Sequence, residues 1–329
     1  MDFKIFLTFD CEDFINHRSI FALYYILKLL HKYNLKGLFF LTGHMAEKIS
    51  RFPKILDLLE DEEIGYHSSA HSVRPIIIEY TDVENYTLAH QFSLMRETRH
   101  INPITGELEG KGGIILLRNL FPNKEIVSFR APGFSYSPPH LEALTELGIK
   151  FDFSANLSPT PINFKNLTFY PFPILMDVIK PLRCAQIYVR NFRRLTKHHI
   201  SVLDFHPHYL VNINHWDSVY FSGNPKKLYP AQARRSEETK LLLKRFELLL
   251  RALSYFENKS LFQVTPALKR GERKTNIDNQ TVIKSFQKSV SWSKKYFGYK
   301  PKFILNHYIK FFDLRMLCEN SHRSKKVDI

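Results

Sequence analysis

The chain of 329 residues has few cysteines and no long apolar run. Its three cysteines, Cys11, Cys184 and Cys318, lie far apart, so the sequence predicts neither a disulfide framework nor a zinc site built on CxxC pairs. No stretch approaches the roughly 18 apolar residues that a membrane-spanning helix requires. The first residues, MDFKIFLTFD, lack the basic start and the small-residue cleavage site of a secretory signal. These absences predict a cytoplasmic protein.

Acidic residues are outnumbered, with 32 Asp and Glu against 47 Lys and Arg, which gives a net charge of +15. This balance favours polyanionic surroundings such as nucleic acid, an anionic membrane surface or a phosphorylated substrate. It is also consistent with a solvated basic surface that has no specific partner. Charged residues make up 24% of the chain, an ordinary globular value that argues against wholesale disorder.

Short apolar runs alternate with segments of helical spacing. Residues 4–9 and 36–41 are predicted to be buried strands, and a short third strand leads into His67. Such alternation is typical of parallel βα units. Further strands expected at 126–129, 151–154, 201–205 and 261–265 bring the total to about seven, which predicts a (β/α) barrel or an open α/β sheet. Helices are expected at residues 19–33, 42–60, 139–147 and 232–255.

Polar residues follow the predicted strands at the ends where both architectures place their chemistry. The residues in these positions are Asp10, His67, Arg130, Asp152 and His206. We therefore expect their side chains to lie close together.

The end of the first strand is rich in carboxylates, and two histidines spaced four apart follow later. On one helical turn, His67 and His71 would face the same point, and imidazole suits borderline cations such as Zn, Co or Ni. The HxxxH spacing also recurs by chance, so the two histidines could instead belong to a surface face or be satisfied polar neighbours. A carboxylate from Glu12 or Asp13 favours the metal interpretation. Cys11 could be a nucleophile or ligand, but strand geometry favours a buried, inert thiol.

Five motifs together resemble those of the NodB-type polysaccharide deacetylases, carbohydrate esterase family 4. Their order matches the family's, over residues from about 5 to 265, and the composite is more specific than any single motif. The motifs are TFDCED at residues 8–13, EIGYHSSAH at 63–71, RAP at 130–132, FDFS at 151–154 and LDFHP at 203–207.

The resemblance implies a distorted (β/α) barrel of about seven strands in residues 1–268 and a metal-dependent removal of N-acetyl groups. Asp10 would be the general base, held by Arg130. His206 would be the general acid, oriented by Asp152. Zinc would be the metal, with cobalt or nickel as alternatives. The implied ligands are His67, His71 and a carboxylate from Glu12 or Asp13.

Three departures from the family pattern leave assignments open. One is that the aromatic partner after the fourth motif is missing, with Asn156 nearby. The family's adjacent Asp-Asp pair is replaced by DCED at residues 10–13, and branches with Asp-x-Glu favour Glu12 over the following carboxylate. Asp204 precedes His206 by two residues, on the same side of a strand, and competes with Asp152 as the orienting carboxylate. For both Asp residues, an ordinary cap or salt bridge is the alternative.

Basic segments occur at residues 183–199, 234–251 and 269–329, the last with an aromatic helical stretch at 303–317 and a tail at 321–329. No nucleic-acid reading module is visible, so nucleic acid is not expected as a partner. The basic helical extension at 269–329 and the basic face at 234–251 are consistent with peripheral contact with an anionic membrane. The alternative is that these segments are solvated surfaces with no specific partner.

The sequence therefore predicts a cytoplasmic, metal-dependent amidohydrolase that removes an acyl group from an amino sugar. The lack of an export signal favours a biosynthetic intermediate, a nucleotide-linked or lipid-linked sugar, as the substrate. Two alternatives stay open: a non-catalytic relative that binds a glycan or lipid carrier, and a C–N hydrolase of a small cyclic amide.

Overall fold

The structure is a computed structural model that describes residues 3–74, 76, 83, 85–164, 166–176, 200–217, 228–260 and 262–268, with a few residues between 281 and 291. The basic segment at 183–199, the helical stretch at 303–317 and the tail at 321–329 lie outside the described residues. The extension at 269–329 and the domain boundary before it stay predictions.

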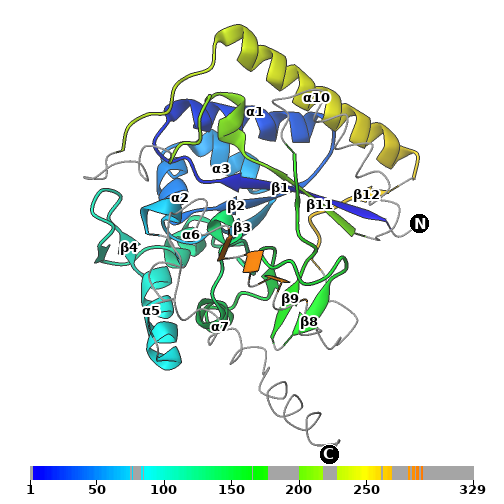
Figure 1. Cartoon of the computed structure of the whole chain (residues 1–329). Coiled ribbons are helices and arrows are strands. Elements are labelled where there is room, and N and C mark those ends of the chain that lie inside the picture. The colour runs from blue at the N-terminus through cyan, green and yellow to red at the C-terminus, as the bar shows by residue number, and fades with distance from the viewer. Residues whose placement is uncertain are drawn as a thin grey trace, which may run out of the picture.

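One sheet forms the centre of the fold (Figure 1). Its strands are β1 (Lys4–Cys11), β2 (Gly37–Leu41), β3 (Glu63–Tyr66), β6 (Ser128–Phe129), β7 (Phe151–Asp152), β8 (Ile162–Phe164), β9 (Leu167–Phe169), β10 (Ile174–Leu175), β11 (Ile200–Phe205) and β12 (Gln263–Val264). The path runs β10-β11-β1-β2-β3-β6-β7-β9-β8, and β12 also pairs with β1. Only the β8–β9 pair in this sheet is antiparallel, among the strands described. The predicted α/β class is confirmed, with the sheet curled into a half-barrel.

Helices cover the sheet and join its parallel strands. The α-helices are α1 (His17–Lys32), α2 (Gly43–Ile49), α3 (Pro53–Leu59), α5 (Tyr86–Thr98), α6 (Ile114–Leu120), α7 (Pro138–Glu146) and α10 (Ser236–Asn258). The segment expected to be helical at residues 42–60 forms two helices, because α2 ends at Ile49 and Pro53 begins α3. The hydroxyl of Thr42 caps α2 by accepting the N–H of Met45 at 3.1 Å. A small separate hairpin pairs β4 (His100–Ile101) with β5 (Leu108–Glu109).

Alternation along β1 separates an apolar face from a face that becomes polar towards its end. Phe9 lies on the helix-covered face, where its ring stacks on that of Phe39 with the ring centroids 4.6 Å apart. It also contacts the ring of Phe246 of α10 edge-on. Phe6, on the opposite face, packs with Tyr170 at 5.3 Å. Since side chains alternate, Asp10 shares the face of Phe6.

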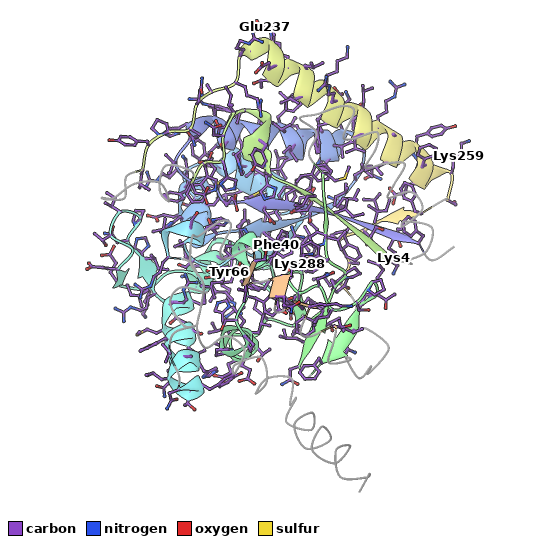
Figure 2. The ribbon with its side chains drawn as sticks, in the orientation of Figure 1. Lys4, Phe40, Tyr66, Glu237, Lys259 and Lys288 are labelled. Atoms are coloured by element: carbon purple, nitrogen blue, oxygen red, sulfur yellow. The ribbon has the colours of Figure 1, made fainter. Side chains whose placement is uncertain are left out.

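Helix α10 lies beside α1 across the helix-covered face, and Figure 2 labels residues near its two ends. Its buried side chains, Leu242, Phe246, Leu250 and Leu253, recur at helical spacing and leave its charged residues, both basic and acidic, outside the buried stripe. No helix in the described part of the chain is long and apolar enough to cross a membrane.

The strand ends bring the predicted polar residues to one edge of the sheet. Phe9 pairs with Phe205, and Tyr66 pairs with both Leu41 and Phe129, so the carboxyl ends of β11, β1, β2, β3 and β6 lie side by side. The residues directly after these strands therefore meet at this edge.

Glu62, just before β3, gives the fold a pH-dependent contribution to stability. Its carboxylate is buried and accepts the N–H of Gly37 at 2.6 Å, at the start of β2. Burial raises the pKa of Glu62 to about 7, against the lowering effect of the Gly37 hydrogen bond. Folding raises the pKa of Glu62, so the protonated side chain contributes fully to stability at pH values below its pKa in the unfolded chain. This contribution is lost as the pH rises through 7, where the buried carboxyl must ionise.

We expect Glu62→Gln to raise the free energy of unfolding by about 2 kcal/mol at pH 8, because glutamine keeps the acceptor without the buried charge. The gain should shrink steadily as the pH falls towards about 4, where Glu62 is protonated in both states. Denaturant unfolding of both proteins across this pH range measures the difference. A difference that does not change with pH would contradict the assignment.

Candidate metal centre

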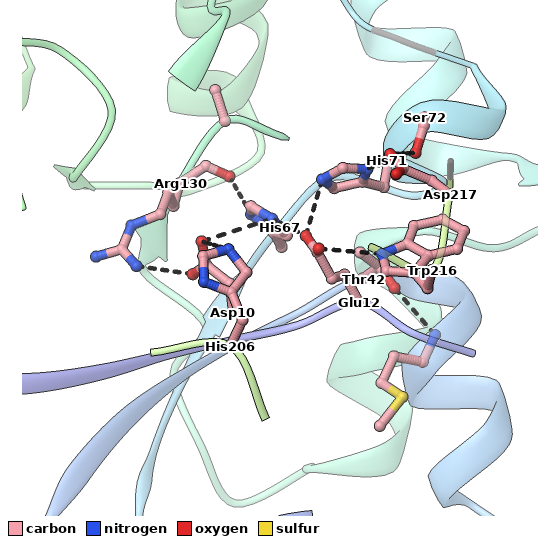
Figure 3. Close-up of polar contacts among 12 residues, drawn as sticks. Asp10, Glu12, Thr42, His67, His71, Ser72, Arg130, His206, Trp216 and Asp217 are labelled. Atoms are coloured by element: carbon pink, nitrogen blue, oxygen red, sulfur yellow. Dashed lines mark hydrogen bonds and ion pairs between the residues drawn. The ribbon is translucent and has the colours of Figure 1, made fainter. Parts of the chain in front are cut away.

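Glu12, directly after β1, lies at the centre of a buried cluster of imidazoles (Figure 3). Its Oε2 lies 3.1 Å from Nε2 of His67 and 2.8 Å from Nε2 of His71. Its Oε1 lies 2.8 Å from Nε2 of His215 and accepts the indole N–H of Trp216 at 3.0 Å. Burial acts to raise the pKa of Glu12, but His71 and His215 outweigh it and hold the pKa well below its usual range. Glu12 is therefore ionised.

The other ring nitrogen, Nδ1, of each of these three histidines also has a polar protein contact. Nδ1 of His67 donates to the carbonyl of Arg130 at 2.8 Å. Nδ1 of His71 contacts the Ser72 hydroxyl at 2.7 Å, and this hydroxyl donates to Asp217. Asp217 also binds Nδ1 of His215. Acceptors in these positions fix ring orientation and tautomer, as they do around histidines that bind metals.

The neighbouring carboxylates raise the pKa of two of the imidazoles. Burial lowers the pKa of His67, but Asp10 and Glu12 outweigh it and raise the pKa above its ordinary value. Burial likewise opposes the effect of Asp217 and Glu12 on His215, whose pKa rises to about 10. A bound cation would compete with protons for these nitrogens.

The expectation that His67 and His71 share one helical turn is wrong. The chain leaves β3 at Tyr66 and forms a loop, and His71 begins the 3-10 helix η1 (His71–Val73). The imidazoles meet, with ring centroids 5.3 Å apart, because the loop turns sharply. Ser68 (φ 63°) and His71 (φ 45°) adopt left-handed conformations that are unusual without glycine and that recur at functional sites.

Glu97 of α5 binds this loop through hydrogen bonds. Its fully buried carboxylate accepts the hydroxyl of Ser68 at 3.1 Å and the N–H of Ser69 at 3.1 Å. Arg96 and His140 supply the neighbouring positive charge and a hydrogen bond. Burial acts to raise the pKa of Glu97, but Arg96 and His140 outweigh it and lower it to about 2.

We expect Glu97→Gln to lower the free energy of unfolding by about 3–5 kcal/mol at pH 7, because it removes the buried negative charge that pairs with Arg96. Denaturant unfolding measures the change. The control is Glu247→Gln, which removes the surface partner of Lys32 and should cost less than about 1 kcal/mol. Equal losses in both variants would contradict the role given to the Glu97 network.

Asp10 lies beside this cluster, on the face of β1 that also carries Phe6 (Figure 3). Its Oδ1 accepts a hydrogen bond from Nη1 of Arg130 at 2.7 Å. Its Oδ2 faces two histidines, with Nε2 of His67 at 3.8 Å and Nε2 of His206 at 3.9 Å. Arg130 thus leaves one oxygen of Asp10 directed towards the imidazoles.

Arg130 is fully buried and shared by two carboxylates. The same Nη1 donates to Asp204, and Nη2 donates to the hydroxyl of Thr8 at 2.9 Å. The guanidinium lies 4.4 Å from the centre of the Phe40 ring. Burial raises the pKa of Asp204 to about 6, against the lowering effect of Arg130.

Asp13 lies outside the histidine cluster although it is only one residue from Glu12. Its oxygens accept the backbone N–H of Asn16 at 3.0 Å, the amide of Asn212 at 2.9 Å and the hydroxyl of Ser19. These contacts fix the start of α1. The structure thus places Glu12, and not Asp13, between His67 and His71.

Asp152 lies at the end of β7 and binds its own turn. It accepts the N–H groups of Ser154 and Ala155 at 3.0 and 2.9 Å and the Ser154 hydroxyl at 2.8 Å. That hydroxyl in turn accepts the N–H of Ala131 at 2.7 Å, next to Arg130. Within the described residues, no hydrogen bond or ion pair joins Asp152 to His206. Burial raises the pKa of Asp152 to about 6, against its hydrogen bonds.

Cys11 points away from the cluster, as strand alternation predicts. Its side chain is buried in the apolar core on the helix-covered face. Burial, with Asp10 and Glu12 adding to it, raises the pKa of the thiol well above its usual range. The thiol is therefore neutral and unreactive.

Several residues of the site were not expected from the sequence. They are Glu97, His208, His215, Trp216 and Asp217. The signal that could have found four of them is the density of His, Trp and Asp in the segment HPHYLVNINHWD at residues 206–217.

Comparisons with known proteins give structural neighbours only. No protein-family model and no curated protein matches the chain. The chain is similar to solved proteins of the CE4 family.

A CE4 esterase from Streptococcus mutans is 15% identical, with 80% of this chain and 86% of that chain covered and a TM-score of 0.44. BA3943, a CE4 family pseudoenzyme from Bacillus anthracis, is 15% identical over 79% of this chain, with a TM-score of 0.40, and this chain spans 62% of its length. Puue allantoinase is 11% identical, with coverages of 91% and 92% and a TM-score of 0.48.

Proposed function

We propose that the chain is a metal-dependent hydrolase that removes an N-acyl group, such as acetyl, from an amino sugar. The observation that carries this proposal is the convergence of Nε2 of His67 and of His71 on one oxygen of Glu12. Asp10 and His206 flank that cluster as the two groups able to move protons.

The residues around Glu12 fit a divalent cation. One carboxylate and two imidazoles form a mixed oxygen and nitrogen donor set that suits zinc, with cobalt or nickel as alternatives. The acceptors on both Nδ1 atoms support this fit. A cation bound here would polarise the amide carbonyl and lower the pKa of water. We assign the carboxylate ligand to Glu12, because Asp13 is engaged with Asn16 and Asn212.

Asp10 is proposed as the general base. Arg130 occupies its Oδ1, so the free Oδ2 can accept a proton from the attacking water. His206, 3.9 Å away, is proposed as the general acid that protonates the departing amine. We propose that Asp152 supports this arrangement through Ser154 and the backbone beside Arg130. The expected orientation of His206 by Asp152 stays a prediction.

The substrate and location are the finer part of the proposal. The net charge of +15 favours an anionic carrier, such as a nucleotide-linked or lipid-linked amino sugar. We propose a cytoplasmic site of action in which the basic side of α10 contacts the anionic inner face of a membrane. The catalytic unit would be residues 1–268.

Acetate release from a panel of compounds tests the proposed function. Zinc-loaded protein would be incubated with N-acetylglucosamine oligosaccharides, a nucleotide-linked N-acetylglucosamine, a lipid-linked N-acetylglucosamine and allantoin. We expect acetate from at least one amino-sugar compound, with the carrier-linked forms preferred. Turnover of allantoin alone would favour the cyclic-amide alternative, and binding without turnover of any compound would favour a non-catalytic relative. Activity on the free oligosaccharide alone would overturn the carrier-linked part.

A further inference from the structure

A second pair of histidines faces the other oxygen of Glu12. After β11 the chain forms the 3-10 helix η3 (Pro207–Leu210), which carries His208, and then reaches His215. Nε2 of His215 lies 2.8 Å from Oε1 of Glu12, and Nδ1 of His208 lies 4.0 Å from the same oxygen. His67 and His71, in contrast, face Oε2. The two pairs thus lie against different oxygens of one carboxylate.

The buried imidazole of His208 indicates a binding site for a ligand. The side chain is 1% exposed, and neither of its ring nitrogens has a hydrogen-bond partner among the described residues. Buried polar atoms are normally paired, since leaving one unpaired costs about 1–3 kcal/mol. One donor atom from each of Glu12, His208 and His215 can be chosen so that all three lie within 4.8 Å of one another.

His215 has the outer contact that is typical of a metal ligand. Its Nδ1 binds Asp217 while its Nε2 faces Glu12. Asp217 also accepts the Ser72 hydroxyl that contacts His71. One carboxylate therefore orients a histidine from each pair.

We propose that Glu12 bridges two cations, one held by His67 and His71 and the other by His208 and His215. The first cation rests on the proposed function, and the second is new. A carboxylate oxygen has two lone pairs, so Oε1 can accept the indole N–H of Trp216 and still bind a cation. The donor atoms form two separate groups that share Glu12, which is the arrangement of a two-metal centre.

Metal stoichiometry tests the second site. Wild-type protein would be stripped with a chelator, reloaded with zinc or cobalt, desalted, and analysed for metal per folded chain. We expect two equivalents in the wild type and one in His208→Ala, His215→Ala and His215→Gln. The control is His31→Ala, since His31 lies on the surface near Asp61. This variant should keep both metal equivalents. His215 is partly exposed, so His215→Gln keeps the test valid if His208→Ala does not fold.

The electron paramagnetic resonance of the cobalt-loaded protein shows whether the two cations are neighbours. Two Co²⁺ ions that share a carboxylate couple, so the signal per cobalt should be weaker in the wild type than in His215→Gln. One equivalent in the wild type would overturn the second site. Two equivalents that survive every His208 and His215 substitution, or that show no coupling, would also overturn it. One equivalent with acetate release intact would leave the proposed function standing, whereas no bound metal would overturn both.

Discussion

Asp10→Asn is expected to lower kcat for acetate release by about 10²–10⁴-fold, because asparagine cannot accept a proton from water. The shape of the side chain is kept, and the amide oxygen can still accept the hydrogen bond from Arg130 that now meets Oδ1 at 2.7 Å. Bound metal should stay at its wild-type amount, since Glu12 and the histidines are unchanged. Steady-state kinetics and metal analysis of the same preparation provide the measurement.

The matched control for this substitution is Asp13→Asn, three residues along the chain. Asp13 is buried and hydrogen-bonded like Asp10, but its partners are Asn16, Ser19 and Asn212, away from the histidines. The Asp13→Asn protein should lose some stability but keep the wild-type kcat per folded molecule. An equal loss of kcat in both variants would mean that the effect is structural, and an unchanged kcat in Asp10→Asn would exclude Asp10 as the base.

Glu12→Gln is expected to weaken metal binding by more than about 100-fold, since even residues that only support a ligand contribute 10–100-fold. Glutamine has the same size and can still accept the indole N–H of Trp216, but it lacks the negative charge that faces His71 and His215. Competition with a coloured chelator measures the affinity. Thermal unfolding checks that the variant is folded.

Asp13→Asn again provides the comparison, because Asp13 is the alternative ligand that the sequence allows. It should bind metal with wild-type affinity. Loss of metal in Asp13→Asn with retention in Glu12→Gln would reverse the assignment of the carboxylate ligand.

The sequence predicts the parts of the fold in which a strong pattern repeats. β1 and β2 are short continuous apolar runs, and the structure buries almost every residue in them. α1 is apolar at helical spacing, and its buried residues follow that spacing. Parallel strands bring their carboxyl ends to one edge, which is why Asp10, His67, Arg130 and His206 could be expected to meet there.

The choice between Glu12 and Asp13 could not be made from strand periodicity. β1 ends at Cys11, so alternation no longer fixes the direction of the two side chains that follow. Asp13 turns towards Asn16 and Asn212, and Asn212 lies 199 positions later in the chain. Only the tertiary structure shows that Asp13 supports α1 while Glu12 is free to face the histidines.

The second histidine pair and the Glu97 network were missed for a similar reason. His208 lies in the short 3-10 helix after β11, and His215 lies in the irregular segment that follows it. No periodicity there predicts which side chains turn inward. Glu97 looks like an ordinary helix residue, and its partners Tyr66, Ser68 and His140 come from distant parts of the chain. Long-range polar contacts leave no regular trace in a sequence.

The measurement that tests the central claim most directly is acetate release from the preferred amino-sugar substrate before and after removal of metal. Protein stripped with a chelator should lose the activity, and stoichiometric zinc should restore it in the wild type but not in Glu12→Gln. A stripped protein that keeps the wild-type rate would contradict the account, because the water would then be activated without a metal centre at Glu12.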